Sequence, residues 1–83
     1  MPKYLITLPQ QPLDQVKAAW ASVVNASGGS GLTMDKAYVD KSKAQAVCCW
    51  NAPDQSSIED LFSRAGVATE SIQEVEEFTP EMV

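Results

Sequence analysis

The chain has 83 residues, a net charge of −5 and no histidine. This length makes one domain, residues 1–83, with a thin stability margin that self-association commonly remedies. The acidic balance argues against nucleic-acid and anionic-membrane partners, because phosphates require cationic side chains. The absence of histidine removes the commonest acid–base catalyst and transition-metal ligand. Enzymatic activity is therefore uncertain, a non-catalytic role is favoured, and no cofactor is expected.

The N-terminus, Met1–Pro9, lacks the features of a full signal peptide because its apolar run is short. No apolar run approaches the roughly 18–20 residues that cross a membrane. We therefore expect a cytoplasmic protein.

The first half of the chain predicts a strand and then a helix. Residues 3–8 are rich in β-forming residues, and Pro9 ends this strand. Pro12 suits a helix start, where its missing N–H costs nothing. Apolar residues recur at helical spacing through 13–27, and the glycine-rich loop 28–31 ends this helix.

A β-hairpin is predicted in the middle of the chain. Residues 32–39 and 44–50 are β-forming segments joined by the polar turn 40–43. Residues on alternate positions of each strand point to opposite faces.

The second helix has signals at both ends. Asp54 is the expected N-cap, with a capping box of Ser56 and Glu59 as a competing alternative. Gly66 is expected to end the helix in a left-handed conformation. The apolar stripe comprises Ile58, Leu61, Phe62 and Ala65.

Residues 71–78 predict a last strand, which Pro80 ends. The element order is then β-α-β-β-α-β. With right-handed crossovers, this order gives an α+β ferredoxin-like fold, also called an alpha-beta plait: a four-stranded antiparallel sheet with two helices on one face.

The other face of this sheet is the candidate site. A hairpin centred on residues 41–42 would pair Met34 with Cys49, Lys36 with Val47, and Tyr38 with Gln45. The candidate ligand or interface face therefore contains Met34, Lys36, Tyr38, Val47 and Cys49. The small apolar positions that would lie under the helices are Ala37, Val39, Ala46, Cys48 and Trp50. An uncovered face this apolar favours a homodimer, with two sheets packed against each other.

The two cysteines are adjacent, so their side chains point to opposite faces. Cys48 is expected in the core, as is common for free cysteine. Cys49 on the open face has three interpretations: interface packing, a soft metal ligand together with Met34, or a redox-active thiol.

Several segments together resemble a known family. They are Lys36-Ala-Tyr-Val-Asp, Ala46-Val-Cys-Cys-Trp-Asn-Ala-Pro, Ala65-Gly, and Ile72-Gln-Glu-Val-Glu-Glu-Phe. Over residues 31–80 the chain resembles a family of small bacterial ferredoxin-like domains of unknown function, which includes a nickel-binding, nickel-responsive protein. The resemblance implies a ferredoxin-like, usually dimeric domain and no assigned reaction. The nickel-binding member is rich in histidine where this chain has none, so no metal ligand is carried over.

Three functional hypotheses follow. The first is a small binding or structural module without catalytic activity, which dimerises through the open sheet face. The second is a metal or small-ligand sensor with a site on that face or at the dimer interface. The third is a small dimeric α/β-barrel enzyme, for which Asp35, Tyr4, Tyr38 or a lysine would have to serve as acid or base. No catalytic residue and no metal ligand is assigned from the sequence.

Overall fold

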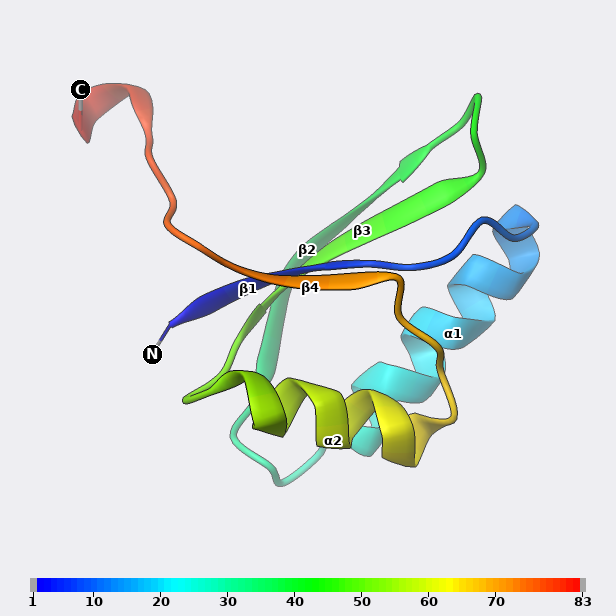
Figure 1. Ribbon diagram of the computed structural model, residues 1–83, viewed down its shortest axis with the longest axis horizontal. Coiled ribbons are helices and arrows are strands. Elements are labelled where there is room, and N and C mark those ends of the chain that lie inside the picture. The colour runs from blue at the N-terminus through cyan, green and yellow to red at the C-terminus, as the bar shows by residue number, and fades with distance from the viewer. Residues whose placement is uncertain (1, 83) are drawn as a thin grey trace.

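The computed structural model describes residues 2–82. The strands form one antiparallel sheet in the order β2-β3-β1-β4, with both helices packed on one face (Figure 1). This arrangement confirms the predicted ferredoxin-like α+β fold. The elements are β1 (Lys3–Thr7), α1 (Leu13–Ala26), β2 (Thr33–Asp40), β3 (Gln45–Asn51), α2 (Gln55–Ala65), β4 (Ser71–Val75) and the short 3-10 turn η1 (Pro80–Met82).

The core lies between the sheet and the helices. Strand alternation supplies one side of it, because every second residue of β1 and β3 is buried. Trp50 of β3 meets Phe62 of α2 edge to face, with ring centroids 6.1 Å apart. Among residues 2–82, no helix has the length and apolar character needed to cross a membrane.

Both ends of α2 agree with the sequence signals. The Asp54 carboxylate accepts hydrogen bonds from Ser57 N at 2.8 Å and Ser57 Oγ at 2.7 Å, so Asp54 is the N-cap rather than Ser56. Gly66 has φ 72° and closes the C-terminus in the left-handed conformation that glycine adopts without a Cβ penalty.

The predicted pairing of the hairpin strands was wrong by two residues. The structure pairs Tyr38 with Val47 and Lys36 with Cys49. The reason lies in the turn, where Ala44 adopts φ 53° and its N–H donates to Asp40 O at 2.8 Å. The turn therefore occupies residues 41–44 instead of the predicted 40–43, and this shift by one residue moves the pairing centre.

Met34 is a second correction to the predicted faces. A β-bulge at Asp35 separates the pair Lys36–Cys49 from the pair Met34–Trp50. The bulge inserts one residue into β2 and so reverses the side to which the preceding residue points. Met34 consequently packs against the core, on the helix side of the sheet.

The last strand is shorter than the predicted 71–78. β4 stops at Val75, which pairs with Lys3, the first residue of β1. Residues 76–78 have no neighbouring strand to pair with, because β1 begins at Lys3. The segment 76–82, here called the C-terminal segment, therefore leaves the sheet (Figure 1).

Candidate functional site on the open sheet face

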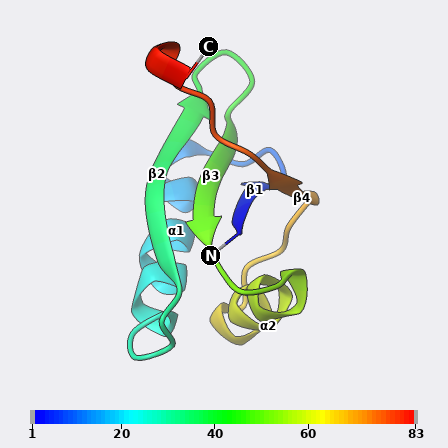
Figure 2. The ribbon, with the colours of Figure 1, turned by 90° about the vertical axis from the view of Figure 1, so that its left-hand side faces the viewer.

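The face of the sheet opposite the helices, here called the open face, consists of three cross-strand rows. The helices and the C-terminal segment lie on opposite sides of the sheet (Figures 1 and 2). Running from β2 to β4, the rows are Tyr38-Val47-Thr7-Ser71, Lys36-Cys49-Leu5-Gln73 and Thr33-Asn51-Lys3-Val75.

Four of the five candidate residues lie together on the open face. Lys36, Tyr38, Val47 and Cys49 form two adjacent cross-strand pairs at the β2 side of the sheet. Tyr38 is 61% exposed, which is high for a large aromatic side chain. Met34 does not join them, so the proposed pairing of Met34 and Cys49 as two soft metal ligands on one face is not formed within the chain.

A hollow of about 320 Å³ lies between the open face and the start of the C-terminal segment. It contains the candidates Lys36, Tyr38 and Cys49. The lining residues that sequence reasoning missed are Lys3, Leu5, Val75, Glu76, Glu77 and Phe78. Leu5 was not identifiable from alternation, because its neighbours Tyr4 and Ile6 are also apolar and no period of two is visible.

A polar cluster occupies one end of the open face. The Lys3 ammonium forms an ion pair with Asp35 and donates to Asn51 Oδ1 at 3.2 Å. Asn51 Nδ2 donates in turn to Asp35 Oδ1 at 2.8 Å and to Thr33 Oγ1 at 3.2 Å. The hydrogen bond to Asp35 raises the pKa of Lys3, and the hydrogen bonds from Lys3 and Asn51 lower the pKa of Asp35. Both groups are therefore held in their charged states at neutral pH.

The two thiols are free and differ in environment. Cys48 is fully buried, and burial raises the pKa of its thiol to about 11. Its sulfur lies 3.8 Å from the carbonyl oxygen of Ile6. Cys49 is only half-buried and lines the open-face hollow. Cys48 is thus a core residue, and Cys49 is the accessible thiol.

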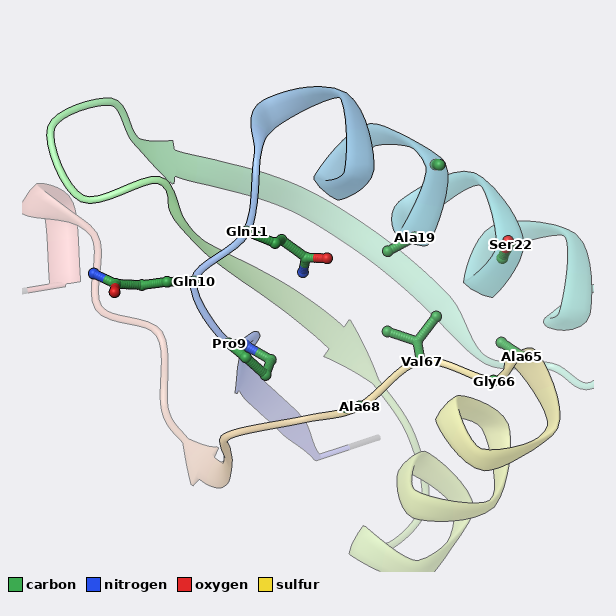
Figure 3. Close-up of a pocket in the computed structure, with 10 residues that line it drawn as sticks. Pro9, Gln10, Gln11, Ala19, Ser22, Ala65, Gly66, Val67 and Ala68 are labelled. Atoms are coloured by element: carbon green, nitrogen blue, oxygen red, sulfur yellow. The ribbon is translucent and has the colours of Figure 1, made fainter.

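A second hollow lies on the helix side (Figure 3). It has a volume of about 400 Å³ and lies between α1, the loop before it, and the connection from α2 to β4. None of its lining residues is titratable at physiological pH: they are Pro9, Gln10, Gln11, Ala18, Ala19, Ser22, Ala65, Gly66, Val67 and Ala68. This hollow therefore offers space but no acid, base or nucleophile.

Tyr4 is the remaining acid–base candidate. Tyr4 points to the helix side and is buried, and this burial raises the pKa of its phenol. It is thus separated from Asp35 and Tyr38 by the sheet.

Within residues 2–82, no three or more His, Cys, Asp or Glu side chains come together in a way that could hold a metal ion.

Comparisons with known proteins give two matches. The profile of a family described as "Nickel responsive protein SCO4226-like" matches residues 5–75. The crystal structure of SCO4226 from Streptomyces coelicolor A3(2) superposes with a TM-score of 0.77 at 16% identity, covering 93% of this chain and 99% of that one. At this identity the superposition shows a shared fold. No curated protein matches the chain significantly.

Proposed function

Because the chain belongs to the SCO4226-like family of nickel responsive proteins, we propose a role that its own residues support: a non-catalytic binding module that pairs with a second copy through the open face. The observation that carries this proposal is the uncovered apolar centre of the sheet. Both helices pack on the opposite face, while Tyr38, Val47, Cys49 and Leu5 stay on the side that neither helix covers. Apolar patches of this kind mark interaction sites.

Pairing would use a modest share of the accessible surface of the chain. A stable interface buries about 800 Å² per partner, which is about a sixth of the 5106 Å² accessible surface of this chain. Two copies joined by a two-fold axis would bury the same surface on each, and every contact between them would occur twice. Aligned sheets pack face to face about 10 Å apart, which suits side chains of this length.

The charged groups at the open face support a non-catalytic role. A general acid or base works best with a pKa near the working pH. The hydrogen bond between Lys3 and Asp35 moves both pKa values away from neutrality, upward for Lys3 and downward for Asp35. These directions are those of a structural ion pair.

The test compares the masses of three proteins by light scattering at equal concentration. Val47→Glu places a charge on the open face, between Tyr38 and Thr7, where pairing would bury it, and should yield monomers of 9.0 kDa. Gln15→Glu adds the same charge on the exposed side of α1 and should leave the wild-type dimer unchanged. Equal dimer content in Val47→Glu and wild type would show that the pairing surface lies elsewhere.

A metal or small-ligand sensor is the second candidate, and the family description favours it. The residues of a single chain do not fit a nickel ion, because residues 2–82 contain no group of three or more His, Cys, Asp or Glu donors placed to hold a metal. The sensor hypothesis therefore requires donors from two copies, of which Cys49 would be one. It predicts that Ni²⁺ raises the melting temperature of wild type and that Cys49→Ser removes this increase. Equal melting temperatures with and without Ni²⁺ would eliminate the nickel version.

The cytoplasmic location belongs to the same proposal. Cys48 and Cys49 are both free thiols, and free thiols are usual in reducing compartments. This supports a protein that works inside the cell.

A further inference from the structure

The C-terminal segment stands away from its own sheet. After Val75 it diverges from the β2–β3 hairpin in Figure 1 and runs in front of the open face in Figure 2. It ends in the turn η1, where Met82 N donates to Thr79 O at 2.9 Å. A long ion pair of 3.9 Å between Glu77 and Lys3 links the segment to the sheet. The hollow of about 320 Å³ separates the start of this segment from the face.

The segment carries two large apolar side chains that are exposed. Phe78 is 66% exposed and Met82 is 62% exposed. Tyr38, at 61%, is exposed on the β2 side of the same hollow that Phe78 lines. Tyr38 and Phe78 thus line one hollow, Met82 follows further along the segment, and burial of these side chains would be favourable.

The charges of the segment and of the hairpin are opposite in sign. The segment contributes Glu76, Glu77 and Glu81 and no cation, whereas the hairpin contributes Lys36, Lys41 and Lys43 against Asp35 and Asp40. The ion pairs found among residues 2–82 are Lys3–Asp35, Lys3–Glu77 and Arg64–Asp60, so the three hairpin lysines do not pair with the segment of their own chain. Within residues 2–82 the acidic segment and Lys36 of the hairpin thus border the same hollow without forming an ion pair.

We propose that the C-terminal segment is an arm that packs on the β2–β3 hairpin of a second copy. This inference rests on the proposed pairing through the open face and names the segment that completes it. In a two-fold dimer the arm of each copy packs on the hairpin of the other copy, so the same contact forms twice. The partner's arm fills the hollow, with Phe78 and Met82 against the partner's Tyr38. The acidic residues of each arm then lie beside the lysines of the other chain, which fixes the orientation of the two copies.

The apolar part is tested by sedimentation equilibrium on three proteins. Phe78→Ser with Met82→Ser should weaken the dimer about tenfold or more, since two large apolar side chains lose their burial. Leu13→Ser with Val24→Ser is the matched control, because these two residues are 46% and 44% exposed on α1. The control should keep the wild-type dissociation constant. If the variant with Phe78→Ser and Met82→Ser also keeps the wild-type dissociation constant while wild type is a dimer, the arm proposal is wrong. Pairing through the open face would not be contradicted by that result.

The electrostatic part is tested by charge reversal. Lys41→Glu with Lys43→Glu should weaken the dimer, and so should Glu77→Lys with Glu81→Lys, each more at low salt than at high salt. A chain that carries all four changes should recover the affinity. A fourfold variant that is weaker than either pair would contradict the proposed contact. A wild-type chain that stays monomeric at every concentration would overturn the pairing itself, and the arm with it.

Discussion

Lys3 and Asp35 form an ion pair that reaches from β1 to the bulge of β2, across the strand between them. Asn51 of β3 lies between the two and contacts both, accepting from Lys3 and donating to Asp35. Residues from three strands are therefore joined at one end of the open face. The bulge makes this contact possible, because it inserts Asp35 as an extra residue between two paired positions of β2.

Asp35→Asn should lower the melting temperature at neutral pH, and this decrease should disappear in acid. The pKa of Asp35 is lowered in the folded state, so its charged form stabilises the fold above the unfolded value of about 3.9. This stabilisation disappears as the pH falls through the lowered folded pKa. The difference in melting temperature between wild type and variant, measured from pH 7 to pH 2.5, should shrink below about pH 4.

The control for this experiment is Asp60→Asn. Asp60 forms an exposed i,i+4 pair with Arg64 at 2.9 Å, and such pairs contribute little. Its melting temperature should stay near wild type at every pH. A difference for Asp35→Asn that does not change with pH would mean that the carboxylate charge is unimportant.

Iodoacetamide at pH 8 should modify Cys49 and leave Cys48 intact in the native protein. With a pKa of about 11, Cys48 is ionised at this pH to about one part in a thousand, and it is also fully buried. Mass spectrometry of digested protein should find Cys48 modified only after unfolding. Cys49→Ser should leave no modifiable thiol in the native state, and rapid native modification of that variant would contradict the placement of Cys48.

Pairing through the open face predicts that Cys49 becomes less reactive as protein concentration rises. The residue lies in the central row, next to Leu5 and Lys36, so a second copy would cover it. The rate of its modification should fall across the concentration range in which dimers form. The Val47→Glu variant should show one rate throughout, and a concentration-independent rate in wild type would argue against a buried Cys49.

Asp54→Ala should lower the melting temperature, while Asp54→Asn should preserve most of it. The Asp54 side chain accepts from the Ser57 backbone N–H at 2.8 Å, and asparagine can accept the same bond. Thermal unfolding by circular dichroism would measure both. Equal losses in the two variants would show that the negative charge, rather than the capping bond, matters.

Gly66→Ala should destabilise the protein by about 1 kcal/mol, because the left-handed conformation is unfavourable for alanine by about this amount. A Cβ at Gly66 would meet nothing within 4 Å, so backbone conformation is the whole cost. Gly28→Ala is the control, since Gly28 is not among the glycines with positive φ. Urea unfolding should separate the two variants, and equal midpoints would contradict the conformational explanation.

The parts of the fold with local signals could be predicted from the sequence. α2 has Asp54 before it, Gly66 after it and an apolar stripe between, and each signal acts within a few residues. The separation of Cys48 from Cys49 was equally predictable, because strand alternation needs no knowledge of the partner strand.

The parts of the site that depend on other strands could not be predicted. The bulge at Asp35 carries no glycine to mark it, so the reversal of Met34 was invisible. The end of β4 depends on where β1 begins, which residues 76–78 do not encode. The sequence alone therefore could not show that Glu77 and Phe78 line the open-face hollow.

The most direct test of pairing is the mass of the unmodified protein in solution. Sedimentation equilibrium of wild type at low micromolar concentration should give twice the chain mass of 9.0 kDa. This result is expected because neither helix covers the apolar centre of the open face. A mass of 9.0 kDa that does not change up to high micromolar concentration would contradict the central claim.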